Sequence, residues 1–459
     1  MTQKTVKKTA ENRPGRMPLA SHGATPLTGR FVIPGDKAIS HRALILAALA
    51  VGHSSIAGLL DAEDIQATAA VLRQLGVGIE RWDDAWHVHG LGVGGLLAPD
   101  RPLDPGNSGT GARLLMGLLA PYGFASHFTG GPALLRQPMR PLLDALAAIG
   151  TVASETADGR LPLTLTGPPM PLPVRHVMAA PSEQVKSALL LAAAQIAGTT
   201  TIVEPVATGD HTEKLLADFG AALQVADDDA GGRTITITGL TELQPRHLVV
   251  PGDPSSAAYP VVAALTVPGS ELIIENVLIS PARTGLIDTL LEMGGDIRFL
   301  NPHEAGGEHV ADLLVRSSRL KGIHVGAAHA ASMLDDIPAL AMAAAHAQGE
   351  TVIEGLGGLR EQDCDRLAAT AAGLAANKVT VNEGDTSLTI GGNGKVEGGG
   401  MVESRSDHRI AMSFLVLGLG SQKRVTLDDT GAIAANFPGF VDAMTAAGAR
   451  FEPVKGREK

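Results

Sequence analysis

The sequence predicts an α/β protein of two domains, each built from three copies of one structural unit. Its 459 residues are more than a single hydrophobic core usually organises. A small or polar cluster opens an apolar helix six times along the chain, at intervals of roughly 71 to 78 residues. The six openings are Asp36, Asn107, Ser182, Pro254, Ser332 and Ser406. Divided evenly, six units give three to each domain.

Each unit is expected to contain a helix, a strand, a second helix and then a pair of strands. The apolar run ALILAALA from Ala43 is typical of the first helices, and TTIVEP from Thr200 of the strands that follow. The second helices are amphipathic and end at a glycine, as in AVLRQLGV from Ala70, where a left-handed cap favours a residue without a Cβ. Alternation of polar and apolar residues, as in RTITITGL from Arg233, predicts the paired strands.

Two Pro-Gly pairs, Pro34-Gly35 and Pro251-Gly252, mark turns or hinges where the chain crosses between the domains. We expect domain I to contain residues 27–35 and 251–459, with repeats 4 to 6. We expect domain II to contain residues 36–250, with repeats 1 to 3. Residues 1–26 lack the apolar segment of a secretory signal and are rich in Lys, Thr, Arg and Pro, so we interpret them as a disordered tail.

The composition excludes several classes of protein. Hydrophobic residues make up 44% of the chain, but the apolar runs are far shorter than the ~20 residues that span a bilayer. A net charge of −11 disfavours nucleic acid as a partner, because a polyanion would be repelled. The single cysteine, Cys364, excludes an internal disulfide and fits a reducing cytoplasm. We therefore expect a cytoplasmic protein without nucleic-acid or membrane partners.

The helix openings carry motifs that identify a family. These are PGDKAISHR from Pro34, GNSGTG from Gly106, QVKSALLLA from Gln184, DHTEK from Asp210, PGDPSSAA from Pro251, ARTG from Ala282, SMLDDIP from Ser332 and DHRIAMSF from Asp407. In order and spacing they resemble the enolpyruvyl transferase superfamily, and most closely the 5-enolpyruvylshikimate-3-phosphate synthases of the glyphosate-insensitive bacterial class. The related UDP-N-acetylglucosamine enolpyruvyl transferases usually carry a cysteine near the position of Arg136, where this chain has none.

The resemblance implies a fold and a reaction. The fold is an inside-out α/β barrel in each of two domains, which close on the substrates. The reaction moves the enolpyruvyl group of phosphoenolpyruvate onto the 5-hydroxyl of shikimate 3-phosphate, by addition at a carbon and later loss of phosphate. It needs fixed cations, a base for the hydroxyl proton and an acid that protonates the methylene carbon. It implies no cofactor and no metal, only the two small-molecule substrates, and a monomer.

Residue by residue, the resemblance implies a site for shikimate 3-phosphate at Lys37, Arg42, Ser182, Gln184 and Asp335. Lys37 stands at a helix opening, which attracts anions, and would bridge both substrates. Arg42 would offer a two-pronged donor, although a surface ion pair is the alternative. Ser182 suits a phosphate or a simple helix cap. Asp335 matches the general base, with Asp336 as its substitute.

The phosphoenolpyruvate site implied by the resemblance contains Lys37, Asn107, Gly109, Gln184, Arg366 and Arg409. Arg366 and Arg409 match two of the three arginines that grip this substrate, with an ion-pair network as the alternative interpretation. The catalytic residues would be Lys37, Asp335, Asp363 and His408. In the family, the position of Gly109 decides glyphosate sensitivity, because glycine leaves room that an alanine would fill.

Four positions lose a ligand group of the family pattern, and a fifth keeps its carboxylate on a shorter side chain. Ala38 replaces a serine that contacts the shikimate carboxylate, and Gln137 and Gly209 replace ligand arginines. Gln362 replaces a lysine that touches both substrates, beside Asp363 in place of a glutamate. At roughly 1.5–3 kcal/mol for each charge-assisted bond, three lost cations predict an efficiency lower by ~10³-fold or more. Two further hypotheses therefore remain: another shikimate-like acceptor, or an inactive binding protein of the same fold.

Overall fold

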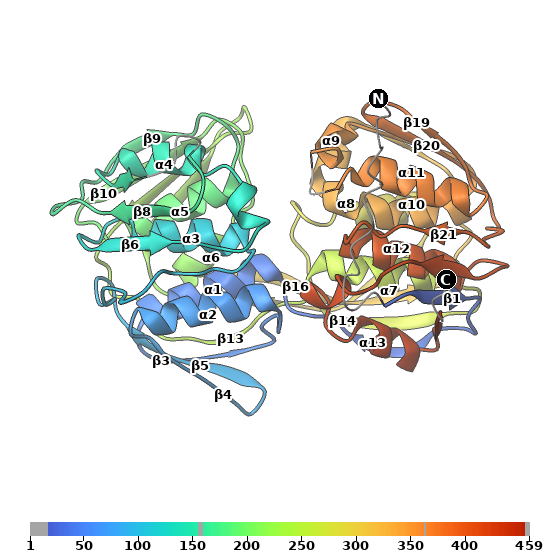
Figure 1. Ribbon diagram of the computed structural model, residues 1–459, viewed down its shortest axis with the longest axis horizontal. Helices are drawn as coiled ribbons and strands as arrows, with labels where there is room; N and C mark the ends of the chain where they lie inside the picture. The colour runs from blue at the N-terminus through green and yellow to red at the C-terminus, as the bar shows by residue number, and fades with distance from the viewer. Residues whose placement is uncertain (1–16, 155–158, 362–363, 455–459) are drawn as a thin grey trace, which may run out of the picture.

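The chain forms two lobes that lie side by side (Figure 1). The computed structural model describes residues 17–154, 159–361 and 364–454. One cluster of buried hydrophobic residues draws on residues 27–33 and 257–449. The other draws on residues 39–250, joined by Leu278. The chain thus leaves one core and enters the other twice, close to the two predicted Pro-Gly crossings. We call the lobe with the first core the C-terminal lobe and the lobe with the second core the N-terminal lobe.

The first repeat follows the predicted order of elements: α1 (Lys37–Leu49), β3 (Val51–Ala57), α2 (Glu63–Gln74), β4 (Gly78–Trp82) and β5 (Ala85–Leu91). The rest of the N-terminal lobe consists of α3 (Gly109–Leu119), β6 (Ala125–Phe128), η1 (Leu134–Arg136), α4 (Arg140–Ala147), β7 (Val152–Ser154), β8 (Leu163–Thr166), β9 (Arg175–Val177), α5 (Glu183–Ala193), β10 (Thr199–Glu204), α6 (His211–Asp218), β11 (Ala222–Asp227), β12 (Arg233–Thr238) and β13 (His247–Val249).

The C-terminal lobe repeats this order and adds two strands from the start of the chain. Its elements are β1 (Leu19–His22), β2 (Thr28–Val32), α7 (Pro254–Thr266), β14 (Glu271–Leu278), α8 (Gly285–Glu292), β15 (Asp296–Ala305), β16 (Glu308–Arg316), β17 (His324–Val325), α9 (Ala327–Ala330), η2 (Ala331–Asp336), α10 (Ile337–His346), β18 (Gln348–Glu354), η3 (Leu356–Leu359), α11 (Arg366–Ala376), β19 (Thr380–Glu383), β20 (Ser387–Asn393), β21 (Met401–Val402), α12 (His408–Leu419), β22 (Val425–Leu427), η4 (Ile433–Ala435), α13 (Phe440–Ala446) and β23 (Arg450–Pro453).

Each repeat supplies one small sheet. The strand orders are β13-β3-β5-β4, β6-β8-β7, β11-β12-β10-β9, β15-β16-β14-β2, β17-β18-β20-β19 and β21-β22-β1-β23. In the first sheet, β3 pairs with β5 in antiparallel and with β13 in parallel orientation. The same arrangement recurs where β14 pairs with β16 and β2. A parallel strand from elsewhere in the chain therefore closes the gap between repeats.

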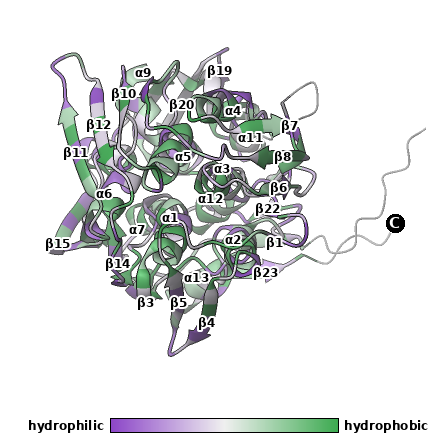
Figure 2. Ribbon diagram, turned by 90° about the vertical axis from the view of Figure 1, so that its left-hand side faces the viewer, coloured by the Kyte–Doolittle hydropathy of each residue, from purple (hydrophilic) through white to green (hydrophobic). Residues whose placement is uncertain are grey.

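The first helix of each repeat lies inside its lobe, and the sheets form the outside. In α1, every residue from Ile39 to Leu49 is buried, and α12 is buried from Ile410 to Leu419. Helices that are apolar all round need neighbours on all sides. Figure 2 shows α3, α5 and α12 near the centre and the strands at the periphery. This is the inside-out α/β barrel predicted. Among the described residues, no helix is long and apolar enough to cross a membrane.

Two of the six predicted helix openings are helix caps, and three more lie one residue from the cap. Asp36 accepts a hydrogen bond from Ile39 N, and Ser182 accepts one from Val185 N. The fifth opening was misplaced: Ser332 lies in η2, and α10 begins at Ile337. Pro338 occupies the second helical position, where a missing N–H costs nothing, and it sets the start of the helix.

The prediction of a disordered tail over residues 1–26 was wrong for its last part. β1 lies between β22 and β23 and pairs antiparallel with both. The reason is topological: the sixth repeat ends with the single strand β23, so its sheet takes a strand from the start of the chain. Ala20 and Ser21 are fully buried there, although the segment is too short for its alternation to stand out in the sequence. Residues 1–16 lie outside the described residues.

The two crossings between the lobes pair with each other. Asp36 N donates to Pro251 O at 2.8 Å, and Asp253 N donates to Pro34 O at 2.9 Å. Gly35 and Gly252 form an antiparallel bridge between them. A Cβ on Gly35 would overlap with the carbonyl oxygen of Gly58. The glycine is therefore required by close backbone approach, and the two crossings form one connection.

Candidate active site

Three predicted site residues meet in the C-terminal lobe, at the start of its inner helices. Asp335 is the second-last residue of η2, Arg366 begins α11, and Arg409 is the second residue of α12. Arg366 Nη1 lies 2.9 Å from Asp335 Oδ1, and Arg409 Nη2 lies 3.3 Å from Asp335 Oδ2. The fifth and sixth repeats thus converge on one carboxylate. Gln362 and Asp363, the predicted neighbours, lie outside the described residues.

Two further carboxylates hold these arginines in place. Arg366 Nε donates to Asp407 Oδ2 at 2.6 Å, and Arg409 Nη1 donates to Asp336 Oδ1 at 3.1 Å. Asp407 also caps α12 by accepting hydrogen bonds from two backbone N–H groups. Cys364 Sγ donates to the same carboxylate at 3.5 Å; burial and then Asp407 raise the pKa of this thiol to about 11. Cys364 is therefore a protonated thiol and a poor nucleophile.

The cluster keeps Asp335 ionised at neutral pH. The guanidinium of Arg409 lowers the pKa of Asp335, burial acts in the opposite direction, and Arg366 adds to the lowering. Burial raises the pKa of the neighbouring Asp336, which is 5% exposed. The side chain of Asp335 is 54% exposed. Of the two aspartates, Asp335 is the one that solvent and substrates can reach.

A chain of polar contacts links this cluster to the N-terminal lobe. His408 Nδ1 lies 3.2 Å from Asn436 Nδ2, and Lys37 Nζ donates to Asn436 Oδ1 at 3.5 Å. Lys37 also pairs with Asp64. Burial and then Arg409 lower the pKa of His408 to about 3, so its imidazole is neutral at pH 7. Sequence reasoning missed Asn436, which lies in a loop after η4 and carries no motif of its own.

In the N-terminal lobe, Gly109 begins α3 beside two polar side chains. Arg113 Nη1 donates to Gly109 O at 3.0 Å and to Gln137 Oε1 at 3.1 Å. A Cβ on Gly109 would overlap with Gln137 Oε1 and lie 2.8 Å from Arg113 Nη1. The space that glycine leaves here is therefore filled by the Gln137 amide. Arg113 is a cation that sequence reasoning missed, although its position one helical turn after Gly109 could have indicated it.

The other predicted residues of this lobe have partners within it. Asn107 Oδ1 accepts a hydrogen bond from Ala133 N at 3.1 Å and holds the loop that carries Gln137. Gln184 Nε2 donates to Thr110 Oγ1 at 3.0 Å, and so joins the third repeat to the second. Ser182 caps α5, as its alternative interpretation allowed. Asn107, Gly109 and Gln184 therefore lie at one group of helix starts.

Arg42 is placed differently from the prediction. It is 1% exposed, and Arg42 Nη2 lies 2.7 Å from Glu183 Oε1. Its other donors bond Thr212 Oγ1, Ser187 Oγ and the carbonyl oxygen of Ala38. In this structure Arg42 does pair with a carboxylate, but the pair is buried and not on the surface as the alternative interpretation had it. Its role as a ligand of shikimate 3-phosphate stays a prediction.

Gly209 lines a cavity of about 530 Å³ between the lobes. Residues from both lobes form its walls: Ala207, Thr208, Gly209, Asp210, Lys214, Arg233, Ser280, Pro281, Ala282, Ala331 and Ser332. Lys186 Nζ donates to Gly209 O at 2.8 Å, and Glu183 Oε2 would lie 2.7 Å from a Cβ on Gly209. The substitution of glycine for a family arginine thus leaves this cavity with Lys214 and Arg233 as its cations.

Arg283 was missed by sequence reasoning, although it belongs to the motif ARTG. Arg283 Nη1 lies 3.3 Å from Asp36 Oδ2, and Arg283 Nη2 lies 2.9 Å from Asp253 Oδ1. These carboxylates cap α1 and α7, directly after the two crossings. Burial lowers the pKa of Arg283, but the two aspartates outweigh it and raise the pKa overall. Arg283 therefore connects the helix start that carries Lys37 to the opposite lobe.

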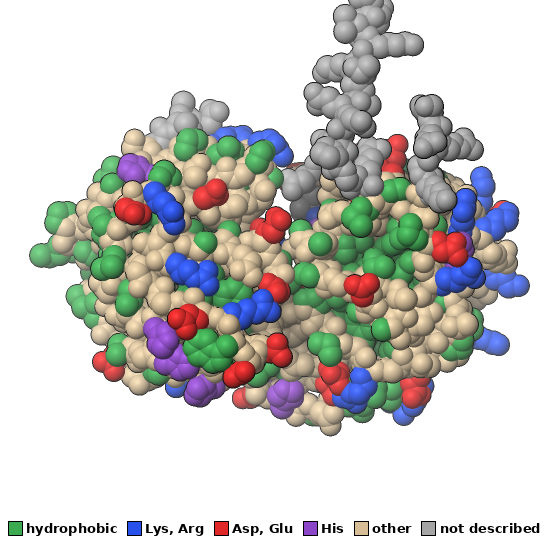
Figure 3. Space-filling view, turned by 60° about the horizontal axis from the view of Figure 1, so that its bottom comes forward, with side chains coloured by type: hydrophobic (Ala, Val, Ile, Leu, Met, Phe, Trp, Pro, Cys, Tyr) green, Lys and Arg blue, Asp and Glu red, His purple; other side chains and the backbone are tan. Residues whose placement is uncertain are grey.

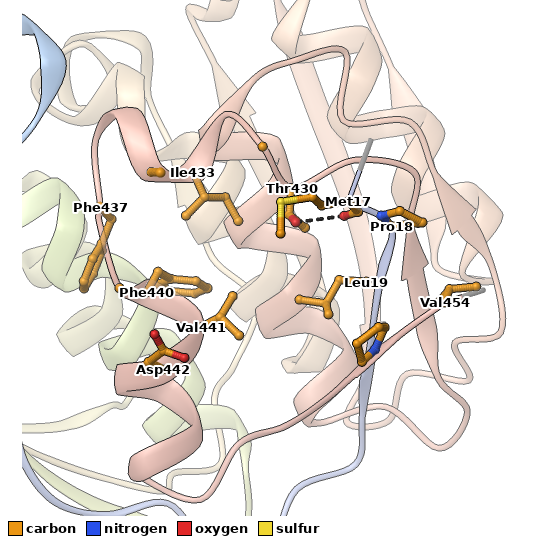
Figure 4. A pocket seen from close by; sticks show the side chains of 14 residues that line it. Met17, Pro18, Leu19, Thr430, Ile433, Phe437, Phe440, Val441, Asp442 and Val454 are labelled. Carbon is orange, nitrogen blue, oxygen red and sulfur yellow. Dashed lines mark hydrogen bonds between the residues drawn. The ribbon is translucent and has the colours of Figure 1, made fainter. Parts of the chain in front are cut away.

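Another cavity, of about 540 Å³, lies against α13 and β1 (Figure 4). Leu19, Ile433, Phe437, Phe440 and Val441 point into it. Among the described residues of its lining, only Thr430 and Asp442 have polar side chains. A site for two anionic substrates needs cations, so this apolar cavity is unsuited to them.

Comparison with known proteins agrees with this geometry. A family model described as EPSP synthase (3-phosphoshikimate 1-carboxyvinyltransferase) matches residues 21–444. The 3-phosphoshikimate 1-carboxyvinyltransferase of Paramagnetospirillum magneticum is 53% identical over 435 residues, covering 94% of this chain and 98% of the relative. That of Parvibaculum lavamentivorans is 52% identical over 442 residues, with the same shares covered.

Solved structures extend the agreement to three dimensions. The EPSP synthase of Acinetobacter baumannii superposes with a TM-score of 0.89 at 36% sequence identity, covering 96% of this chain and 100% of the other. The enolpyruvyl transferase NikO from Streptomyces tendae has a TM-score of 0.73 at 21% identity over the same shares, which supports the fold alone. Together with the convergence of Asp335, Arg366 and Arg409, these matches show that the chain belongs to the EPSP synthase (3-phosphoshikimate 1-carboxyvinyltransferase) family.

Proposed function

We propose that this chain transfers the enolpyruvyl group of phosphoenolpyruvate to the 5-hydroxyl of shikimate 3-phosphate. The observation that carries the proposal is the meeting of Arg366, Arg409 and Asp335 at the starts of α11, α12 and α10. Two fixed guanidinium groups bind an anion, and a half-exposed carboxylate beside them accepts a proton. Lys37, which reaches towards this cluster through Asn436, supplies a cation from the opposite lobe.

Phosphoenolpyruvate would bind to Arg366 and Arg409 by exchanging ion pairs. Both arginines now pair with Asp335, and an incoming carboxylate or phosphate competes for the same N–H donors. When these donors turn to the substrate, the cause of the low pKa of Asp335 weakens. Asp335 then becomes the stronger base as the donor substrate binds, and it takes the proton from the 5-hydroxyl of the acceptor.

His408 is suited to positioning more than to acid catalysis, since its neutral imidazole has no acidic proton to give near pH 7. Asp363 stays a candidate for proton transfer. The acceptor would lie between Asp335 and the starts of α3 and α5, where Gly109, Asn107, Gln184 and Ser182 gather. No metal or cofactor is part of this proposal. The proposal includes a monomer in the cytoplasm, whose two lobes close on the substrates at the paired crossings.

The two other hypotheses are not favoured. Relatives that are 49–53% identical over most of the chain all carry the name 3-phosphoshikimate 1-carboxyvinyltransferase. The departures at Ala38, Gln137, Gly209 and Gln362 therefore accompany the same overall sequence pattern as the named enzymes. They bear on the rate of the reaction more than on its kind.

Phosphate release in the presence of both substrates tests the proposal. We expect phosphate and enolpyruvylshikimate 3-phosphate in equal amounts, identified by mass spectrometry, and no phosphate when either substrate is omitted. Calorimetry with shikimate 3-phosphate alone serves as a control for folding of the acceptor site. Binding of the acceptor without phosphate release would support the inactive binding protein instead. Turnover with a different cyclohexene polyol alone would support the other acceptor.

A further inference from the structure

Four histidines gather on the outer face of the sheet β13-β3-β5-β4. His53 lies on β3, His87 and His89 on β5, and His247 on β13. His53 stands directly opposite His89, and His87 stands opposite Ser55, which in turn faces His247. Because side chains alternate along a strand, the core-facing residues of β5 leave these imidazoles on the solvent side. Figure 3 shows histidine side chains grouped on the surface of this lobe.

Two of the imidazoles lie edge to edge. His53 Nε2 is 3.0 Å from His87 Nδ1, and the two rings are parallel to within 1°. The ring of His89 lies 4.9 Å from that of His53. Trp82 stacks on His87 with 3.5 Å between the ring centroids, so His87 is only 9% exposed. His87 Nε2 has no hydrogen-bond partner within the described part of the chain.

The distance between the two nitrogens matches a chelate. Imidazole nitrogens bind first-row metals at about 2.0–2.1 Å, so two ligands at a right angle are about 2.9 Å apart and two at a tetrahedral angle about 3.4 Å apart. The observed 3.0 Å is the length of a hydrogen bond and is close to the right-angled spacing, so the two rings need only turn about their side-chain bonds for both lone pairs to meet at one ion. Cu²⁺ and Ni²⁺ favour right-angled coordination, whereas Zn²⁺ in proteins is mostly tetrahedral.

We propose that His53 and His87 form a binding site for a divalent transition-metal ion with right-angled coordination. The ion replaces the hydrogen bond between the two nitrogens, and the imidazole that donates this bond carries its proton on its other ring nitrogen instead, so that both ligands stay neutral imidazoles. Trp82 stacks on His87 and fixes the plane of its ring. None of these residues is among those assigned to the substrates, so the site is independent of the proposed function.

A second group of potential ligands, Asp210, His211 and Glu308, is less suited to a metal ion. Lys214 Nζ lies 3.0 Å from Asp210 Oδ1 and 2.9 Å from Glu308 Oε2. His211 Nδ1 lies 2.6 Å from Glu308 Oε1. The lysine ammonium already supplies the cation between these carboxylates. In the histidine group, by contrast, the nitrogens of His53 and His87 face each other.

Titration of the full-length, untagged chain with NiCl₂ tests the proposal, because tryptophan fluorescence reports on the site. The sequence contains two tryptophans, of which Trp86 is 4% exposed in the core and Trp82 stacks on His87. We expect one equivalent of Ni²⁺ to quench the emission of Trp82, with reversal by EDTA. Isothermal titration calorimetry should give the same stoichiometry, and ZnCl₂ should bind at least ~3-fold more weakly.

Variants locate the ion. His53→Ala should weaken Ni²⁺ binding by ~10-fold or more, since a chelate becomes a single ligand. His324→Ala, which removes another exposed histidine, should leave binding unchanged. Trp82→Phe should abolish the quenching but keep the calorimetric signal. If His53→Ala and His87→Asn both bind Ni²⁺ as the parent does, or if the parent binds no Ni²⁺, the site does not exist. Tighter binding of Zn²⁺ would overturn the right-angled geometry.

Discussion

The two halves of the candidate active site are built differently. In the C-terminal lobe, Arg366 and Arg409 are held between Asp335, Asp336 and Asp407, so each cation keeps at least two anionic partners. In the N-terminal lobe, the predicted cations other than the partly exposed Lys37 are buried or absent. Arg42 is enclosed by its own lobe, and glutamine or glycine stands at positions 137 and 209. Of the four ligand groups that the chain lacks, three would lie in the N-terminal lobe, at Ala38, Gln137 and Gly209.

This difference indicates where the chain tolerates change. An arginine that is locked between aspartates cannot be lost without leaving buried carboxylates unpaired, which costs several kcal/mol. A cation at the edge of a cavity, such as the family arginine at position 209, pairs with fewer buried carboxylates. Its replacement therefore costs less stability. We therefore propose that the C-terminal half of the site determines the reaction and that the N-terminal half adjusts how strongly the substrates bind.

The largest effect is expected from the locked arginines. Arg409→Gln should lower kcat/KM by ~10³-fold or more, because two or three charge-assisted hydrogen bonds of about 1.5–3 kcal/mol each are lost. Steady-state kinetics with both substrates would measure this. Arg316→Gln, which removes an exposed arginine paired with Glu271, is the matched control and should change kcat/KM less than 2-fold. A loss below 10-fold for Arg409→Gln would contradict the central place of this residue.

A smaller effect should follow from the residue that joins the halves. Arg283→Gln should raise the KM for shikimate 3-phosphate by ~10-fold or more, because the caps of α1 and α7 lose their shared cation. Arg283→Lys should recover part of this loss. Small-angle scattering with and without acceptor would show whether closure is affected. An Arg283→Gln variant that closes and turns over like the parent would show that the crossings need no such connection.

Gln137 offers a way to strengthen the N-terminal half. Glyphosate should inhibit the parent poorly, because the Gln137 amide fills the space beside Gly109 and carries no charge. Gln137→Arg should lower the inhibition constant by ~10-fold, even though the new cation lies near Arg113. Gln137→Arg and Gln362→Lys should each also raise the catalytic efficiency, and the double variant should be more efficient than either single variant. Sub-micromolar inhibition of the parent would show that Arg136 or Arg113 already supplies the missing charge.

The smallest effect on turnover is expected at His408. Its native pKa of about 3 lies below the ordinary value of an unfolded histidine, so the unfolded chain binds a proton first as pH falls. Stability should therefore decrease from about pH 6.5 downwards, by up to about 1 kcal/mol per pH unit from this residue. Urea denaturation between pH 5 and pH 8 measures the free energy of unfolding at each pH. This free energy should change less with pH in His408→Gln than in the parent.

The same variant separates positioning from acid catalysis. If His408 only positions Asn436 and Lys37, His408→Gln should change the height of the pH–rate profile of kcat and leave its shape unchanged. A lost ionisation between pH 5 and pH 8 would restore His408 as the catalytic acid.

The sequence by itself determined the repeats, the family and most of the residues that converge. Six apolar helices with capping residues at regular intervals define the inner helices, because local periodicity and caps are properties of short segments. Asp335 and Arg409 could be named because each belongs to a motif near the start of such a helix, and Arg366 because the resemblance extends to the start of α11. The inside-out arrangement came from resemblance to a family, since no local pattern says which face of a repeat turns inward.

Only the tertiary structure decided how the charges pair. The sequence could not show that Arg42 is enclosed by Glu183 and Thr212, that Gln137 fills the space beside Gly109, or that Arg283 joins two helix caps. It also could not show that residues 19–22 complete the sheet of the sixth repeat. These contacts join residues up to several hundred positions apart. Their partners are chosen by the packing of whole repeats, and no local segment contains that information.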